Sequence, residues 1–411
     1  MPQPQVRRCR RLLQVDDPAT GRISAAGIAY PAPHEYTLPM TPRLMTAALA
    51  CLLLAACAAT APPRGDVPAP APVAGAARSA PQPLVLAERY VSDDSPQDEL
   101  DSLATWTTED GRTWLIASAK SSHRLVVFDA DSGGRLRTFG SEGDGPGQFK
   151  RPNGVAVHGD HLFVVERDNH RVQVLSLPGF EVVGTFGASE LRSPYGVWLT
   201  ETEPEELEVY ITDSFMYGRK FDQVPPFAEL DQRVRRYRVQ FDQAGRLVTQ
   251  YAGSFGDTRE ASALRMVESI AGDPANDRLL IADEDRRHES TLREYSFSGR
   301  YTGRSLPQDS FGAEAEGVAL WSCPDGGGYW VAVDQLAPLT VFHLFDRVTL
   351  APLGSFHGAL TARTDGVALH AAATPSFPGG ALFAVHDDKA VTAFDLRDVA
   401  RALGLPSACT E

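Results

Sequence analysis

Acidic, basic and polar side chains recur at two kinds of position in this chain. One group stands at the start of short apolar segments: Asp101, Asn153, Tyr195, Glu268, Glu316 and Asp365. A second group stands at or just after the end of other short apolar segments: Lys120, Arg167, Asp213, Asp283, Glu284, Asp285, Asp334, Gln335, Asp387 and Asp388. Carboxylates held close together repel one another unless a cation neutralises them. If the fold gathers these residues, the sequence predicts a cation site.

Calcium suits such a cluster, because Ca²⁺ takes about six to eight oxygen ligands in flexible geometry. Lys120 and Arg167 beside bound Ca²⁺ would favour a phosphorylated substrate, and a metal ion can activate water for attack on phosphorus. Any single aspartate is explained as well by the capping of a turn. The functional interpretation therefore rests on the ring as a whole.

A repeat indicates how these residues are gathered. Six short strand-like segments recur about every 50 residues, with one longer gap: 114–118, 162–166, 209–213, 279–283, 329–334 and 382–387. Each period holds about four short strands, and amphipathic helical patterns are scarce. The sequence predicts an all-β fold, a six-bladed β-propeller of four-stranded antiparallel blades. A β-sandwich would not explain the period. The long gap holds an insertion, Met216–Gln232, which we expect to be a loop over one face.

Blade geometry explains why strand ends matter. The first strand of a blade lines the central channel and the second runs back beside it. The start of the first strand and the end of the second therefore emerge on one face, where residues distant in sequence form a ring.

Charge and composition limit the partners. The 411 residues include 39 basic and 53 acidic side chains, a formal net charge of −14, so we expect no nucleic-acid partner. No apolar run reaches the roughly 18 residues of a membrane-spanning helix. We expect a monomer.

The N-terminal residues have the features of a targeting segment rather than of a folded domain. Residues 1–39 are basic and lack periodicity, and we interpret them as an upstream extension that precedes a start at Met40. Residues 40–57 have the features of a secretory signal. Their end, Leu54–Cys57, resembles the lipobox of bacterial lipoproteins, which implies lipidation of Cys57; an ordinary buried cysteine is the alternative. Residues 58–83 form an Ala/Pro-rich linker and 84–411 the propeller, so we expect a lipid anchor in the bacterial cell envelope, on the periplasmic face of the outer membrane or the cell surface.

Two cysteines remain in the predicted propeller, Cys323 and Cys409. An exported domain permits a disulfide between them, and two separate thiols are equally compatible with the sequence.

Two family resemblances follow. Gly145–Val157 with Asn169–Leu175 resembles an NHL-type repeat, which serves many functions. Residues 100–405 resemble the β-propeller phytase family. The pieces that carry this resemblance are Asp101–Trp106, Pro194–Gly196, Val267–Glu268, Leu280–Asp285, Glu314–Val318, Gly328–Gln335, Phe345–Arg347, Thr364–Gly366, Ala381–Asp387 and Asp398–Leu403.

The phytase resemblance implies that calcium at the channel mouth bridges the phosphates of phytate and that a calcium-activated water hydrolyses the ester. It implies Glu268, Glu314, Glu316 and Asp365 as calcium ligands, and the ring adds Asp101 and Asp387. It implies that Lys120, Arg167 and Tyr195 contact phosphate, and that Glu268, Glu284, Lys120 and Arg167 carry catalysis.

Three positions depart from that family, because Ser102, Ala359 and Ala368 stand where it has acids. Fewer carboxylates should weaken calcium binding or reduce the number of ions. Three functions stay open: a calcium-dependent phytase-like hydrolase, a non-catalytic NHL-like binding propeller of the cell envelope, and another metal-dependent propeller hydrolase such as a lactonase.

Overall fold

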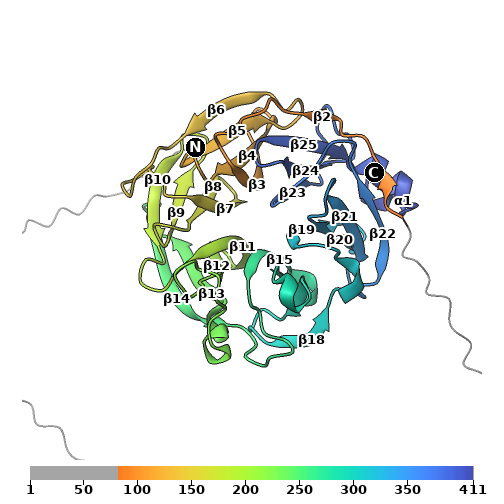
Figure 1. The fold of residues 1–411 in the computed structure, drawn as a ribbon. Coiled ribbons are helices and arrows are strands. Elements are labelled where there is room, and N and C mark those ends of the chain that lie inside the picture. Colours follow the sequence, from red (N-terminus) through yellow and green to blue (C-terminus); the bar gives the residue numbers. More distant parts are fainter. Residues whose placement is uncertain (1–81, 411) are drawn as a thin grey trace, which may run out of the picture. The chain divides into compact units, whose positions relative to one another are not determined.

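The computed structural model describes residues 82–410, which form six sheets in a ring (Figure 1). Blade 1 contains β3 (Leu100–Thr107), β4 (Thr113–Ala119), β5 (Arg124–Asp129) and β6 (Arg135–Phe139). Blade 2 contains β7 (Pro152–His158), β8 (His161–Glu166), β9 (Arg171–Ser176) and β10 (Glu181–Phe186). Blade 3 contains β11 (Pro194–Glu203), β12 (Glu206–Asp213), β13 (Val234–Phe241) and β14 (Leu247–Phe255).

The second half of the ring repeats this order. Blade 4 contains β15 (Val267–Asp273), β16 (Arg278–Asp283), β17 (Thr291–Tyr295) and β18 (Tyr301–Ser305). Blade 5 contains β19 (Ala315–Ser322), β20 (Gly328–Asp334), β21 (Val341–Asp346) and β22 (Pro352–His357). Blade 6 contains β23 (Val367–His370), β24 (Ala381–His386) and β25 (Ala390–Asp395). The predicted six-bladed propeller is confirmed, and every consecutive pair of strands within a blade is antiparallel.

The N-terminal part of the described chain closes the ring. β2 (Tyr90–Val91) pairs with β25 as the outer strand of blade 6, and β1 (Leu84–Val85) runs parallel to β22 as a fifth strand of blade 5. The helix α1 (Leu396–Leu403) follows β25, and a disulfide joins Cys323 to Cys409. The two ends of the domain are thus held to blades 5 and 6. The helices in the described part of the chain are too short or too polar to span a membrane.

The core lies between blades. Successive side chains of a strand face opposite sides, so Leu115 and Ala117 of β4 pack towards blade 6 while Ile116 packs towards blade 2. The described residues form six buried clusters, one at each junction between neighbouring blades. Because both faces of the second strands are buried, these strands are nearly continuous apolar runs rather than alternating ones.

The insertion of blade 3 lies on the face where the inner strands begin. It contains the short 3₁₀ helix η1 (Phe227–Gln232) and a bridge between Tyr217 and Gln223. Arg287 of the neighbouring η3 (Arg286–His288) donates from Nη1 to the carbonyl of Asp222 at 3.4 Å. The predicted loop therefore borders the same mouth as blade 4.

Candidate functional site

A β-bulge at the start of each innermost strand builds the first ring. In blades 1 to 5 the pairing register with the second strand shifts at this point, and in blade 4 the shift lies between Val267 and Ile270. In blade 6 Gly366 receives a hydrogen bond from the amide of Val385 at the equivalent place. The residues at this position are Asp101, Asn153, Tyr195, Glu268, Glu316 and Asp365. A bulge re-aims side chains, and here it places one from each blade at the channel mouth.

Glycines after the ring residues let the blades approach. A Cβ on Gly196 would lie 2.4 Å from the carbonyl oxygen of Glu268 in the next blade, and one on Gly366 would lie 2.3 Å from the carbonyl oxygen of Asp101. Gly154 and Gly317 make the same close approach to their neighbours. The repeated glycine in the sequence therefore reflects tight packing of ring residue against ring residue.

A second ring follows the end of each second strand. Its residues are Lys120, Arg167, Ser214, Glu284, Gln335 and Asp387. Each donates its backbone amide to the carbonyl of a residue just before the first ring; for example, the amide of Glu284 donates to Met266 and that of Gln335 donates to Glu314. This shared bond fixes both rings at the same end of the channel.

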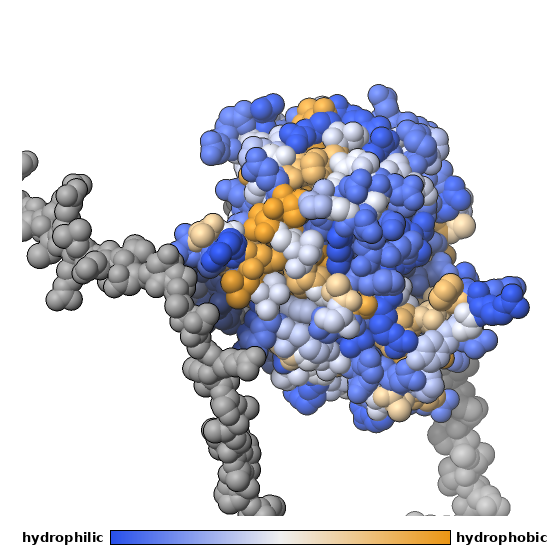
Figure 2. Space-filling model, turned by 90° about the vertical axis from the view of Figure 1, so that its left-hand side faces the viewer, coloured by the Kyte–Doolittle hydropathy of each residue, from blue (hydrophilic) through white to orange (hydrophobic). Residues whose placement is uncertain are grey.

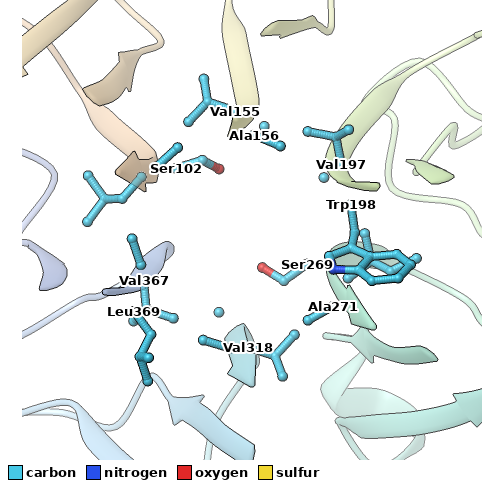
Figure 3. Close-up of a pocket in the computed structure, with 18 of the residues that line it drawn as sticks. Ser102, Val155, Ala156, Val197, Trp198, Ser269, Ala271, Val318, Val367 and Leu369 are labelled. Carbon is cyan, nitrogen blue, oxygen red and sulfur yellow. The ribbon is translucent and has the colours of Figure 1, made fainter. Parts of the chain in front are cut away.

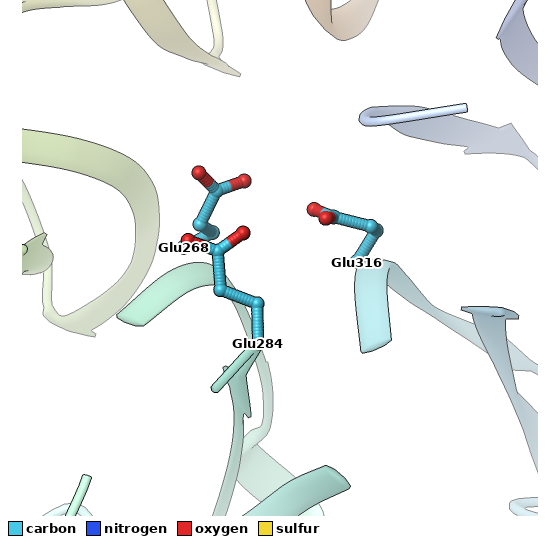
Figure 4. A group of neighbouring side chains, drawn as sticks. All are labelled: Glu268, Glu284 and Glu316. Carbon is cyan, nitrogen blue, oxygen red and sulfur yellow. The ribbon is translucent and has the colours of Figure 1, made fainter. Parts of the chain in front are cut away.

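Three carboxylates meet at blades 4 and 5 (Figure 4). Oxygens of Glu268, Glu284 and Glu316 all lie within 4.8 Å of one another. Glu316 is only 4% exposed, and its Oε2 is buried without a hydrogen-bond partner. Among residues 82–410, no lysine, arginine or histidine forms an ion pair with any of the three. We call Glu268, Glu284 and Glu316 the glutamate trio.

Burial and mutual repulsion keep protons on the trio. Burial together with Glu284 and Asp101 raises the pKa of Glu268 well above its usual value. Burial together with Glu268 and Glu284 does the same to the pKa of Glu316. Burial together with Glu314 and Asp365 raises the pKa of Glu284 to about 8. The trio thus has the electrostatics of a group that a bound cation would neutralise.

Lys120 occupies the other side of the mouth. Its Nζ lies 3.0 Å from Asp365 Oδ2, 3.5 Å from Asp101 Oδ2 and 3.7 Å from Glu99 Oε1. Burial opposes its charge, but Asp101 and Asp365 raise the pKa of Lys120 above its usual value. Burial raises the pKa of Asp101 to about 6, although Lys120 acts to lower it. Lys120 is therefore a permanent cation at this site.

The remaining predicted residues lie further from the trio or pair elsewhere. Glu314 lies 3.9 Å from Arg286, and Arg167 pairs with Asp168 at 2.7 Å. Asp387 is bound by Arg363 and by Lys389, the latter at 3.3 Å. Tyr195 borders the site, because burial and then Glu268 raise the pKa of its hydroxyl.

The acids that end the second strands have a structural role. Asp283 accepts the amides of Arg265 and Met266 at 3.1 and 3.0 Å. Asp213 and Asp334 accept backbone amides of the preceding loops in the same way. For these three residues the capping interpretation describes what is observed.

Sequence reasoning missed two side chains of the mouth. Glu99 pairs with Lys120 and also with Arg151, whose Nη2 lies 2.8 Å from Glu99 Oε1. Both stand two residues before a first-ring position, Asp101 and Asn153 respectively. That spacing is the signal that would have found them.

Most side chains that line the channel beyond the ring are apolar (Figure 3). The channel is a cavity of about 510 Å³, lined by side chains that include Val155, Val197, Val318 and Val367, with Ser102 and Ser269 among them. Ala368 also lines it, whereas Ala359 lies in an exposed loop and donates its amide to Glu88 at 3.0 Å. The polar chemistry is thus concentrated at the ring.

The flank of the molecule seen in Figure 2 is largely hydrophilic. The flank that carries the outer strands of blades 2 and 3 shows an apolar band among hydrophilic side chains (Figure 2). On the face with the ring, Phe221 of the insertion is 76% exposed.

Comparison with known proteins supports one repeat. A profile of the NHL repeat family matches residues 149–175, which confirms the predicted NHL character of this region. No curated protein matches the chain. Among solved structures the chain is similar to Kuenenia stuttgartiensis hydrazine synthase, at 14% identity over 77% of this chain and 81% of that chain, with a TM-score of 0.44. That likeness carries no argument about function.

Proposed function

We propose that this chain is a calcium-dependent phosphate monoester hydrolase of the phytase type, carried on a lipid-anchored propeller. The observation that supports the proposal is the glutamate trio, three carboxylates within 4.8 Å of one another with no cationic partner among the described residues. Lys120 lies beside them at the same mouth.

The residues present fit a calcium ion. The trio supplies only oxygen donors, the type that Ca²⁺ prefers, and Glu316 Oε2 is a buried acceptor without a partner. Glu268, Glu284 and Glu316 would hold the ion, and Glu314 lies close enough to Glu284 to affect its pKa. Bound calcium would supply positive charge to a phosphate group and make a bound water more acidic.

The protein groups around the trio have distinct tasks in this proposal. Lys120 keeps its proton, so it supplies positive charge to phosphate oxygens and does not act as a base. Tyr195 also keeps its proton, since burial and Glu268 raise its pKa, and its hydroxyl can donate to the substrate. Arg167 is partly exposed in the second ring and would contact an outer phosphate.

The location follows from residues outside the described part of the chain. Cys57 would carry the lipid, and the Ala/Pro-rich linker, which begins at residue 58, would hold the propeller off the membrane. A monomer in the bacterial cell envelope would then act on a phytate-like compound bridged by calcium.

Phosphate release from phytate by the purified protein tests the proposal, with calcium titrated and a chelator as control. We expect release that requires calcium, and loss of release in Glu316→Gln. Glu203→Gln is the matched control, because Glu203 is exposed at the far end of the inner strand β11. No release at any calcium concentration, with the folded protein verified by circular dichroism, would refute the enzymatic function.

A second candidate is a non-catalytic binding propeller. The NHL match at 149–175 and the exposed Phe221 beside the mouth favour it. In that case the same face would bind a partner in the cell envelope, and Phe221→Ser would weaken the complex recovered after crosslinking of cells.

A further inference from the structure

The acceptors around Lys120 are already occupied by hydrogen-bond donors. Asp365 receives Lys120 Nζ at Oδ2 and the side-chain amide of Gln335 at Oδ1, at 3.0 and 2.8 Å. Asp101 receives Asn153 Nδ2 at Oδ2 at 3.3 Å and Ser102 Oγ at Oδ1 at 3.4 Å, with Lys120 Nζ 3.5 Å from Oδ2. Both oxygens of each carboxylate are engaged, so neither is a vacant ligand.

The glutamate trio differs in this respect. Glu316 Oε2 is buried and has no donor, and no ion pair reaches Glu268, Glu284 or Glu316 from the described residues. Across the mouth, three carboxylates (Glu99, Asp101 and Asp365) surround Lys120, whose side chain is only 7% exposed. The mouth therefore has two similar acidic groups, one with a cation built in and one without.

We propose that Lys120 is an internal cation that fills one of two equivalent positions in the ring, so that the mouth takes a single divalent cation, at the glutamate trio. Asp365 and Asp101 then bind the ammonium group of Lys120 and are not ligands of the metal ion. The cation at the trio is the one part of this inference that rests on the proposed function. The hydrogen bonds of Lys120 are observed independently of that function.

The proposal predicts a second metal position when the ammonium is removed. Lys120→Met keeps much of the side-chain stem but leaves Glu99, Asp101 and Asp365 without their shared cation. Three carboxylates plus water can hold Ca²⁺. Lys120→Arg, which keeps the charge, should not open that position.

Isothermal titration calorimetry with Ca²⁺ alone provides the stoichiometry. We expect one ion for the unmodified protein and for Lys220→Met, a control on an exposed lysine of the insertion, and two ions for Lys120→Met. Should Lys120→Met fail to fold, the calcium affinities of two carboxylate variants test the proposal instead. Asp365→Asn removes a nearby negative charge but no ligand, so it should weaken the calcium affinity by about tenfold or less, whereas Glu316→Gln should weaken it by about 30-fold or more.

The outcomes separate this inference from the proposed function. Two ions in the unmodified protein, or an Asp365→Asn loss as large as that of Glu316→Gln, would overturn the internal cation and leave the calcium site standing. No ion in the unmodified protein but one in Lys120→Met would refute the trio as a calcium site and support the internal cation. No ion in either protein would overturn both.

Discussion

Replacing Glu316 by glutamine should stabilise the calcium-free protein, and the gain should grow as the pH rises. The substitution keeps the shape of a buried side chain and removes one of three neighbouring charges. At an effective dielectric constant of about 20, two unit charges 4.8 Å apart repel by about 3.5 kcal/mol, and one oxygen of each trio carboxylate lies within this distance of the others. Protons held by the trio reduce this repulsion, so we expect a gain of about 2 to 3 kcal/mol at pH 8.5.

The pH dependence has a definite sign. A folded-state pKa above the unfolded one means that the folded protein binds more protons, so stability falls as pH rises. For Glu284 this window runs from 4.5, its usual value, to about 8. Near pH 4.5 the trio is protonated and Glu316→Gln should have little effect. At pH 8.5, above the pKa of Glu284, the unmodified protein carries more of this repulsion than at pH 5, and the variant carries less of it.

Thermal unfolding by circular dichroism with a chelator, at pH 5 and pH 8.5, measures this difference. At about 2 °C per kcal/mol for a domain of this size, Tm should rise by roughly 4 to 6 °C in the variant at pH 8.5 and by less than about 1 °C at pH 5. Saturating calcium should reverse the order, because it stabilises the unmodified protein through the trio. A variant that is less stable than the unmodified protein at pH 8.5, while Glu203→Gln is unchanged, would refute the view that repulsion among the trio's carboxylates destabilises the fold.

Two further predictions concern the frame that holds the ring. Gly196→Ala should destabilise the fold by about 2 kcal/mol or more, because its Cβ would meet the carbonyl oxygen of Glu268. The same substitution should weaken calcium binding in a calcium titration. The control Gly179→Ala, where the nearest contact is a side chain, should leave calcium binding unchanged in that titration. Replacing Cys323 and Cys409 by serine should lower the free energy of unfolding by about 2 to 4 kcal/mol in a denaturant titration without changing calcium affinity, and a changed affinity would mean that the disulfide positions the mouth.

The sequence predicted the propeller because its physical signals are repeated. Second strands buried on both faces are apolar nearly throughout, and the close approach of Gly196 to Glu268 requires glycine after the bulge. β2 escaped prediction because a strand of two residues, Tyr90 and Val91, has no periodicity. It is specified by pairing with β25, some 300 residues away, which no local pattern encodes.

The sequence predicts which side chains lie at the channel mouth, but it does not predict which groups each of them contacts. Blade geometry places Glu284 and Asp283 at the same strand end, yet one reaches the trio while the other caps the preceding loop. Asp283 and Glu284 are neighbours in the chain, so their side chains point in different directions. The pairing register of β15 and β16 decides which of the two side chains points to the trio. Asp387 occupies the same position as Glu284, but Arg363 and Lys389 bind it from blade 6.

The departures from the phytase-like pattern become intelligible when they are placed on the ring. Ser102 follows Asp101 and Ala368 lies three residues after Asp365, so both stand on the strands that supply the partners of Lys120. None falls on the glutamate trio. A group that surrounds an ammonium has one positive charge to balance, whereas a group that surrounds a divalent cation has two, and every surplus buried carboxylate destabilises the fold. With Ser102 and Ala368 in place of acids, fewer negative charges surround Lys120, and the oxygen donors of the trio are intact.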